Sequence, residues 1–452
     1  MAPKRPRRRP AVHIVTLGCP KNEVDSDRMT ASLSEAFDVV EDPDDADVVV
    51  VNTCAFIREA TEESIGVVLE FAEWKRAAEG RALVVAGCMP SRYGEDLAAE
   101  LPEVDAFVPV SAEAGITSAL ARVCGVPLGS PQAAPDAAGK GRRAPAKVPG
   151  PVMRTAQKPS AYLQISDGCH RRCSFCTIPA IRGDYRSRTA ADLIEETRVL
   201  VAGGAKEIVL VGQDVSAWGR DLPGKPSLAE LVRKLVRLHG VEWLRLMYVQ
   251  PDGVTPELLE TMADEPKVCR YLDLPLQHAS RDVLSRMGRQ GDAAEFLRLI
   301  STIRSLVPGV FLRTTLIAGF PGETRHDSEV LQRFVRDAAF DYVGVFAYSP
   351  EEGTRAAALP DQVPLRTRRV RAQRLRDLGD EIGVARASRL VGRPFTVLVE
   401  GVDEEGVTVA RHRGQGPEVD GIVLIDRPLR PGTLTSVQIT DTLGYDLLGE
   451  VM

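Results

Sequence analysis

The chain has 452 residues, of which 44% are hydrophobic and 27% are charged, and its net charge at pH 7 is −6. This composition is typical of a globular protein, and the length predicts about two to four domains. No apolar run approaches the roughly 20 residues that cross a bilayer, so no membrane partner is expected. The negative net charge argues against a protein that coats nucleic acid with its whole surface.

Residues 1–10 are rich in Lys, Arg and Pro and predict a disordered basic tail. The apolar stretch that follows is too short and too polar for a signal peptide, and it has no cleavage site. We therefore expect a cytoplasmic protein. In that reducing compartment its eight cysteines are expected to bind metal or to react, and not to form disulfides.

Residues 11–125 predict a parallel α/β domain. Three continuous apolar runs, as expected for strands covered on both faces, lie at 13–17, 47–51 and 83–87, with helical patterns between them. One cysteine follows each run, and these are Cys19, Cys54 and Cys88. Ligand sites in open parallel sheets lie at the carboxyl ends of the strands, so the three side chains are expected to converge. The alternative for each cysteine is a small buried hydrophobic residue.

Residues 126–154 interrupt this pattern with a stretch rich in Pro, Ala and basic residues, which predicts an extended interdomain linker. From 155 to 387 the alternation of strands and helices resumes, and strand patterns lie at 161–166, 206–212, 243–249, 271–274, 310–319 and 341–348. Six β/α units resemble a partial TIM-type barrel, (β/α)6, because a complete barrel has eight. Residues 388–452 hold five short strand patterns separated by Gly, Pro and Asp, and they predict a small antiparallel β-barrel.

The stretch SDGCHRRCSFCTIP places Cys169, Cys173 and Cys176 in the spacing C-x₃-C-x₂-C, directly after the first strand of the partial barrel. A structural zinc site and a ferredoxin cluster each require four protein ligands, and no fourth ligand follows at a suitable spacing. Three thiolates on a cluster of four irons leave one iron open to a substrate. The motif also lies at the end of the strands where barrel enzymes place their chemistry.

This arrangement resembles the radical S-adenosylmethionine (SAM) superfamily. The resemblance implies that Cys169, Cys173 and Cys176 hold a 4Fe–4S cluster whose open iron binds SAM. No catalytic residue beyond the cluster ligands is expected.

With its N-terminal cysteines and its small C-terminal barrel, the whole chain resembles the radical SAM methylthiotransferases, in which that barrel is called the TRAM domain. The resemblance implies that Cys19, Cys54 and Cys88 hold a second 4Fe–4S cluster, which carries the sulfur. It further implies that one SAM methylates this sulfur and that a second SAM yields a 5′-deoxyadenosyl radical, which removes hydrogen from the acceptor carbon. An electron donor such as a flavodoxin or a ferredoxin is implied as a partner.

Members of this family modify either adenosines of transfer RNA or the β-carbon of an aspartate in the small-subunit ribosomal protein S-twelve. Motifs such as LGCPKNEVDSD, LVGQDVSAWGRDL and FAYSPEEGT resemble the ribosomal-protein branch, whereas the transfer-RNA branch resembles GCQMN where this chain reads GCPKN. Residues 388–452 contain six arginines, no lysine and ten acidic residues, a net charge of −4 that suits a basic protein better than RNA. An acidic surface without a partner is the alternative reading of that charge.

We therefore expect a methylthiotransferase that acts on S-twelve, either free or in the small ribosomal subunit, and transfer RNA is not expected as a substrate. The nearer alternative is a transfer-RNA methylthiotransferase of the same architecture. The alternative from another class is a non-catalytic iron–sulfur protein that transfers electrons or binds RNA.

Four residues are candidates for contact with SAM: Gly204 and Glu207 from an imperfect Gly-Gly-Glu element at the second barrel strand, and Gln277 and His278 after the fourth. The alternatives are a glycine that ends a helix and a hydrogen-bonded loop histidine. Cys124 and Cys269 fit no cluster position, and buried thiols are expected there. An Arg-rich helical pattern at 367–390 predicts a solvated helix face, with contact to ribosomal RNA as the alternative.

Overall fold

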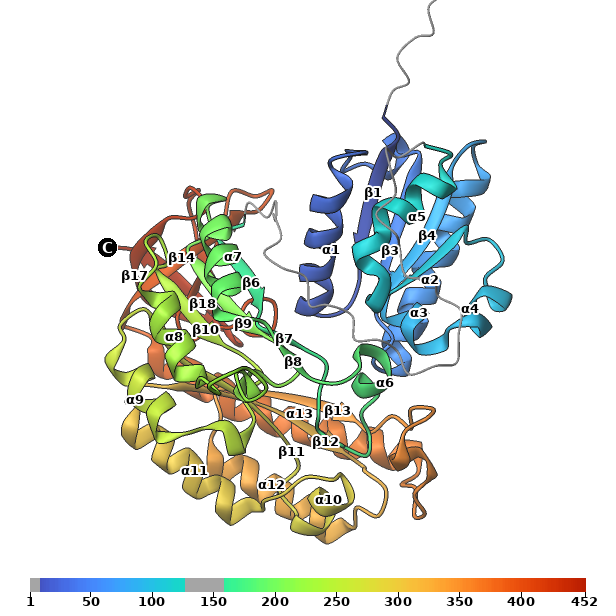
Figure 1. The fold of residues 1–452 in the computed structure, drawn as a ribbon. Coiled ribbons are helices and arrows are strands. Elements are labelled where there is room, and N and C mark those ends of the chain that lie inside the picture. Colours follow the sequence, from blue (N-terminus) through green and yellow to red (C-terminus); the bar gives the residue numbers. More distant parts are fainter. Residues whose placement is uncertain (1–8, 127–157) are drawn as a thin grey trace, which may run out of the picture. The chain divides into compact units, whose positions relative to one another are not determined.

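The computed structural model describes residues 9–126 and 158–452, which form two compact units (Figure 1). The first unit contains the described residues up to 126 together with two short segments, Asp167–Cys169 and Thr177–Asp184. The second unit contains the other described residues. Apart from residues 9, 10 and 126, the predicted tail and linker lie outside the described ranges.

The first unit is built on a parallel sheet in the strand order β2-β1-β3-β4-β5. Its strands are β1 (Ala11–Thr16), β2 (Asp38–Val39), β3 (Val48–Thr53), β4 (Ala82–Gly87) and β5 (Ala106–Pro109). Because β3 and β4 are buried along their whole length, they take the β-branched and small apolar residues that fit a sheet covered on both faces. The predicted parallel α/β domain is confirmed. The edge strands β2 and β5 were not predicted, since two and four residues are too few to show a period.

Alternate residues of β3 divide the core of this unit between the two faces of the sheet. Val48 and Val50 belong to one apolar cluster, which includes residues of α1 (Pro20–Leu33) and α5 (Ile116–Val123). Val49 and Val51 belong to the other cluster, which includes residues of α2 (Arg58–Arg76), α3 (Cys88–Tyr93), α4 (Glu95–Glu100) and α6 (Ile178–Arg182). This is the period of two that a strand imposes on its side chains. The helices on each face can be followed in Figure 1.

The second unit contains a six-stranded parallel sheet in the order β13-β12-β11-β10-β9-β6. The strands are β6 (Ser160–Gln164), β9 (Glu207–Val211), β10 (Trp243–Leu246), β11 (Val268–Gln277), β12 (Phe311–Ala318) and β13 (Tyr342–Ala347). Two further short strands, β7 (Ser166–Asp167) and β8 (Arg186–Ser187), pair with each other. The six-stranded sheet is the predicted partial barrel.

Helices follow the strands of this sheet in alternation. They are α7 (Ala190–Ala202), α8 (Leu228–Val236), α9 (Pro256–Asp264), α10 (Arg281–Arg286), α11 (Ala293–Leu306), α12 (Arg325–Ala338) and α13 (Leu365–Ala387). Five of them start where a short polar side chain accepts a hydrogen bond from a free backbone N–H of the first turn, at Thr189, Ser227, Thr255, Asp292 and Thr324. Within residues 9–126 and 158–452, no helix is both long enough and apolar enough to cross a membrane.

The C-terminal part of the second unit is a closed barrel in the order β14-β15-β16-β18-β17. Its strands are β14 (Pro394–Val402), β15 (Thr408–His412), β16 (Val423–Ile425), β17 (Leu434–Leu443) and β18 (Asp446–Val451). The predicted small antiparallel barrel is confirmed, and the one neighbouring pair that departs from it is β16 and β18, which run parallel. Five strands cannot alternate in direction all the way round a closed ring, so one neighbouring pair has to be parallel.

Buried ion pairs join this barrel to the six-stranded sheet. Glu207, the first residue of β9, binds Arg245 of β10 through Oε1 at 2.7 Å and Arg411 of β15 through Oε2 at 2.5 Å. A second pair joins Arg313 of β12 to Asp420, which lies between β15 and β16, at 3.0 Å. The side chains of Glu207, Arg245 and Arg411 are at most 1% exposed. Because a buried charge is costly unless it is paired, this contact holds the two parts together in one geometry.

Candidate functional site

The first unit brings its three strand-end cysteines together, as predicted. Cys19 directly precedes α1, Cys54 directly follows β3, and Cys88 is the first residue of α3. The sulfur atoms of Cys19 and Cys88 lie 3.7 and 3.8 Å from the same atom, Oδ1 of Asn22. Gly18 passes so close to Cys54 that a Cβ added to this glycine would lie 2.5 Å from the cysteine Cβ. The adjacent strands β1, β3 and β4 therefore end at one site that holds three thiols.

Asn22 fixes the geometry of this site from the first turn of α1. Its Nδ2 donates to the backbone carbonyls of Leu17, at 2.9 Å, and Thr53, at 3.0 Å, so the amide links the residue after β1 to the last residue of β3. With both donors engaged, Oδ1 faces the sulfur atoms of Cys19 and Cys88. Asn22 is fully buried. The GCPKN stretch is therefore a strand end followed by a helix start, and its asparagine shapes the thiol site.

Arg182 is a functional candidate that the sequence did not reveal. It ends α6, six positions after Cys176, and its side chain is only 2% exposed. Its Nη2 binds Asp25 at 2.7 Å and Asn22 at 3.2 Å, and it lies 4.0 Å from the sulfur of Cys88. Nη1 contacts Asp167 at 3.3 Å. The sequence shows only that a basic residue follows the C-x₃-C-x₂-C motif. It does not indicate that this residue lies close to Cys88 of the first unit.

The three thiols differ in how readily they lose a proton. Burial raises the pKa of Cys54, and it raises the pKa of Cys88 to about 12. Burial acts in the same direction on Cys19, but the charges of Lys21 and Arg182, together with hydrogen bonds from the backbone N–H groups of Asn22 and Lys21, outweigh it, so the pKa of Cys19 is lowered. Cys19 is thus the thiol best prepared to act as a thiolate before any metal arrives.

These residues fit an iron–sulfur cluster by the chemistry of the donor set. Thiolates are the ligands that such clusters use, and a buried guanidinium close to the sulfur atoms balances part of their charge. Within the described parts of the chain, no three His, Cys, Asp or Glu side chains are arranged to hold a single metal ion.

The C-x₃-C-x₂-C motif is divided between the two units. In the first unit, the backbone N–H of Cys169 donates to Gly183 at 3.2 Å. In the second unit, the N–H of Cys176 donates to the carbonyl of Cys173 at 3.3 Å, and Nη1 of Arg289 lies 3.9 Å from the sulfur of Cys173. All three cysteines are half-buried. The loop thus presents three partly accessible thiols, with a guanidinium beside one of them.

Two of the four predicted SAM contacts lie at the carboxyl ends of the strands. Gln277 ends β11 with a φ of 70°, a left-handed conformation that turns the chain sharply at this point. His278 is fully buried, and its Nδ1 accepts from the N–H of Ser280 at 2.9 Å. Its Nε2 has no hydrogen-bond partner within the described residues and lies 3.6 Å from Glu323. A ligand on this face could therefore still engage the imidazole.

The other two predicted SAM contacts are not supported by the structure. Gly204 forms the turn after α7, with its N–H donating to Val201 at 3.0 Å, which is the helix-end alternative. Glu207 opens β9, roughly 13 Å of strand from the carboxyl end, and both its oxygens bind arginines. Gly204 and Glu207 are therefore corrected to a turn residue and a structural ion pair.

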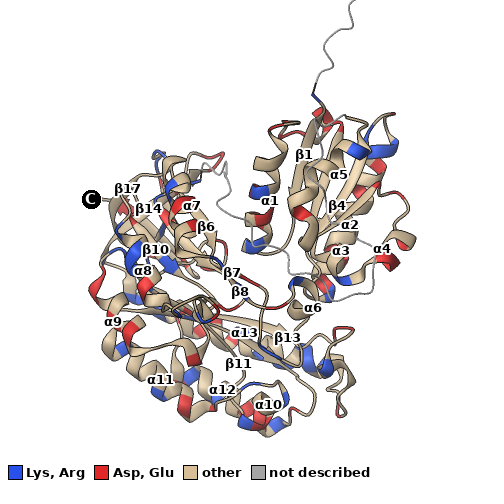
Figure 2. Ribbon diagram, in the orientation of Figure 1, with Lys and Arg blue, Asp and Glu red and all other residues tan. Residues whose placement is uncertain are grey.

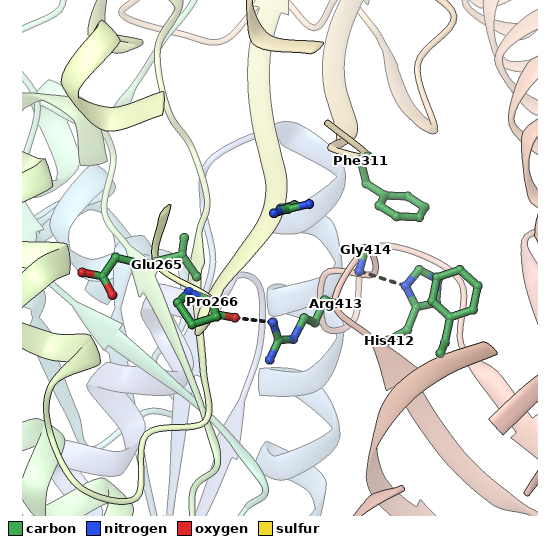
Figure 3. A pocket seen from close by; sticks show the side chains of 10 residues that line it. Glu265, Pro266, Phe311, His412, Arg413 and Gly414 are labelled. Atoms are coloured by element: carbon green, nitrogen blue, oxygen red, sulfur yellow. Dashed lines mark hydrogen bonds between the residues drawn. The ribbon is translucent and has the colours of Figure 1, made fainter. Parts of the chain in front are cut away.

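A cavity of about 310 Å³ in the second unit lies at the other end of the strands (Figure 3). It is lined by the first residues of β11 and β12, Val268 and Phe311, and by His412 and Arg413 of the small barrel. Burial lowers the pKa of His412 to about 3, so its imidazole is neutral. The cavity contains no cysteine and faces away from the carboxyl ends, and it is not part of the candidate site.

The Arg-rich helix α13, whose arginines are blue in Figure 2, is only partly solvated. Four of its arginines turn inward. Arg368 and Arg376 donate to the carbonyls of Tyr348 and Val345, and Arg371 and Arg386 bind Glu323 at 2.9 Å and Asp341 at 2.6 Å. Its other arginines between 366 and 376 are exposed, as expected. Cys269 is fully buried, as expected, whereas Cys124 is half-buried at the end of α5.

Three family models match the chain in succession. They are the Uncharacterized protein family UPF0004 over residues 11–109, the Radical SAM superfamily over 163–335 and the TRAM domain over 391–452. The radical SAM methyltransferase TsrM from Kitasatospora setae has a related fold, with a TM-score of 0.56 and 16% identity over 94% of this chain and 83% of that one.

The curated relatives include proteins named ribosomal protein uS12 methylthiotransferase RimO. The protein from Geobacter sulfurreducens is 42% identical over 98% of both chains. The protein from Moorella thermoacetica is 44% identical over 97% of this chain and 99% of its own.

The parallel sheets, the strand-end cysteines and the three matched modules define a radical SAM enzyme, a class that carries a 4Fe–4S cluster and uses SAM. At this level of identity and coverage, the chain belongs to the RimO family of methylthiotransferases.

Proposed function

We propose that the protein transfers a methylthio group to the β-carbon of an aspartyl residue in ribosomal protein uS12, the small-subunit protein S-twelve. The observation that carries this proposal is the end-to-end similarity to relatives named for that reaction, at 42% identity over 98% of the chain. The domains proposed for this work are residues 11–125, 155–387 and 388–452, and the family matches fall inside them.

In this proposal two groups of cysteines hold two 4Fe–4S clusters. Cys169, Cys173 and Cys176 hold the one that binds SAM, and the second is held by Cys19, Cys54 and Cys88. When bound, the first supplies the electron that cleaves SAM and the second carries the sulfur to be transferred. The protein's own residues bury the thiols, orient them through Asn22 and balance their charge through Arg182.

Gln277 and His278 are proposed to line the SAM site, since both lie at the carboxyl end of β11. The buried Nε2 of His278, which lacks a hydrogen-bond partner within the described residues, is suited to a polar group of the ligand. Replacing His278 with Ala is therefore expected to weaken SAM binding.

The charge of the C-terminal barrel favours a protein substrate. Of its ten acidic residues and six arginines, Asp420 and Arg411 are buried in the contact with the six-stranded sheet. The nine acidic residues and five arginines that remain give the same net charge of −4 (Figure 2). Such a surface attracts a basic protein and repels phosphates. A reduced flavodoxin or ferredoxin is proposed as the electron donor, and the cytoplasm, where ribosomes are found, as the place of action.

The test is an anaerobic reaction of the reconstituted, reduced protein with SAM and either uS12, small ribosomal subunits or transfer RNA. Mass spectrometry is expected to detect a methylthio group on an aspartate of uS12 and none on the RNA. Modification of the RNA alone would instead support the transfer-RNA alternative. An electron carrier would yield no 5′-deoxyadenosine from SAM.

The variant Cys54→Ala tests the second cluster within this proposal. It is expected to abolish transfer of the methylthio group while leaving cleavage of SAM, because the two groups of cysteines serve different steps. Liquid chromatography of 5′-deoxyadenosine and mass spectrometry of uS12 measure the two activities separately. Unchanged transfer would rule out Cys54 as a ligand.

A further inference from the structure

Arg182 has more hydrogen-bond acceptors around it than a structural ion pair requires. Its Nη2 faces Oδ2 of Asp25 at 2.7 Å, Oδ1 of Asn22 at 3.2 Å and the sulfur of Cys88 at 4.0 Å. This nitrogen carries two hydrogens, so it cannot satisfy all three acceptors at once. A neutral thiol is the weakest of the three. Once iron binds, the sulfur of Cys88 becomes a thiolate, and a charged acceptor competes far better for the guanidinium.

The same arginine relieves an unfavourable contact that ligation would create at Asn22. Oδ1 of Asn22 faces the sulfur atoms of Cys19 and Cys88, and it suits them as long as they carry protons to donate. Two thiolates would instead face a carbonyl oxygen of like partial charge. The hydrogen bond from Arg182 to this oxygen withdraws negative charge from it, so the site tolerates the ligated state.

The charges near Arg182 show what its removal would do. Asp25, with a side chain only 5% exposed, and Asp167 both bind its guanidinium. Without Arg182, the carboxylate of Asp25, whose charge acts on Cys88, would have no counterion from this position, and Asp167 would lose its contact with the guanidinium. The potential of an iron–sulfur cluster depends on local charge and on hydrogen bonds to its sulfur atoms, and added negative charge makes reduction harder.

We propose that Arg182 is a positioning residue for the cluster held by Cys19, Cys54 and Cys88, where it donates to the sulfur of Cys88 and sets the reduction potential. This inference rests on the second cluster of the proposed function. Through Asp25 and Asn22, the arginine also ties the first turns of α1 to the thiol site.

The experiment uses the full chain with Cys169, Cys173 and Cys176 replaced by Ala, so that only the second cluster is reconstituted. Iron content, the electron paramagnetic resonance spectrum of the reduced state and the midpoint potential are measured without any turnover. Arg182→Gln is expected to shift the midpoint to more negative values and to change the spectrum. Asp25→Asn keeps the arginine and removes one opposing charge, so it is expected to shift the midpoint to more positive values.

Arg76→Gln is the matched control, since this arginine is 61% exposed at the far end of α2. If Arg182→Gln binds the cluster and matches the control in potential and spectrum, the inference is wrong. If Arg182→Gln loses iron, the midpoint of Asp25→Asn decides. A shift to more positive values than the background protein, with iron retained by Arg182→Lys, supports the inference, and an unchanged midpoint overturns it. If the background protein binds no iron, the second cluster itself is refuted and the inference falls with it.

Discussion

Replacing Glu207 with Gln removes the charge at the centre of the contact between the six-stranded sheet and the small barrel. The substitution keeps the size of the side chain but leaves the guanidinium groups of Arg245 and Arg411 without their shared carboxylate. All three side chains are buried, so solvent cannot replace the lost partner. The expected result is a second unit that unfolds at a lower urea concentration.

The loss of unfolding free energy in Glu207→Gln is estimated in two ways. Removing one partner of a buried ion pair costs about 3–5 kcal/mol. Burial alone would raise the pKa of Glu207, but Arg245 and Arg411 outweigh it and lower that pKa from 4.5 to about 2. At about 1.4 kcal/mol for each pKa unit, this difference corresponds to roughly 3 kcal/mol of stability at neutral pH.

The pKa also predicts how the effect depends on pH. The folded-state pKa of Glu207 lies below its unfolded value, so its contribution is complete above about pH 4.5 and is lost as the pH falls towards 2. The difference in unfolding free energy between the wild type and Glu207→Gln is therefore expected to be full at pH 7 and to shrink below pH 4.5.

Urea unfolding followed by tryptophan fluorescence measures this difference. Trp243 pairs with Glu207 across β9 and β10, so its emission reports on the contact. Glu195→Gln is the control, because this carboxylate is 53% exposed in a surface pair and is expected to contribute at most about 1 kcal/mol. Equal midpoints for the two variants at pH 7, or a gap at pH 3 as large as the gap at pH 7, would refute the reasoning.

Two glycine substitutions test close contacts elsewhere in the chain. Gly18→Ala, at a φ of 95°, would place a Cβ 2.5 Å from the Cβ of Cys54. The variant is therefore expected to bind less iron while it still forms 5′-deoxyadenosine. Full iron content would contradict this prediction. Gly383→Ala would overlap the ring of Tyr445, and a loss of about 1–3 kcal/mol is expected in thermal unfolding. Gly401→Ala is its control, since no atom lies within 4 Å of the added Cβ, and equal melting temperatures would contradict the prediction.

Short patterns of apolar residues in the sequence are sufficient to predict most of the fold. Four consecutive valines before Asn52 identify a strand buried on both faces, and the cysteine after such a strand is placed at its carboxyl end by the direction of the chain. The convergence of Cys19, Cys54 and Cys88 follows from this rule together with the order of the strands. The single parallel pair in the small barrel depends on how the ring closes, which no individual strand pattern contains.

The rest of the site depends on partners that are far apart in the sequence. Arg182 binds Asp25, which is 157 positions earlier, and nothing near either residue indicates this pair. The glycines before Glu207 predict a SAM contact, whereas its partner Arg411 lies 204 positions later. A buried charge takes its role from the counterion that the fold brings to it, and short motifs do not identify that counterion.

The division of the buried charges has a consequence for exchanging modules between relatives. The six-stranded sheet contributes Glu207, Arg245 and Arg313, and the small barrel contributes Arg411 and Asp420. A foreign barrel without matching charges would take one arginine from Glu207 and the carboxylate of Asp420 from Arg313, both in a buried contact. Chimeras that aim to redirect this enzyme to another substrate will therefore have to transplant the docking residues of the barrel together with its outer surface.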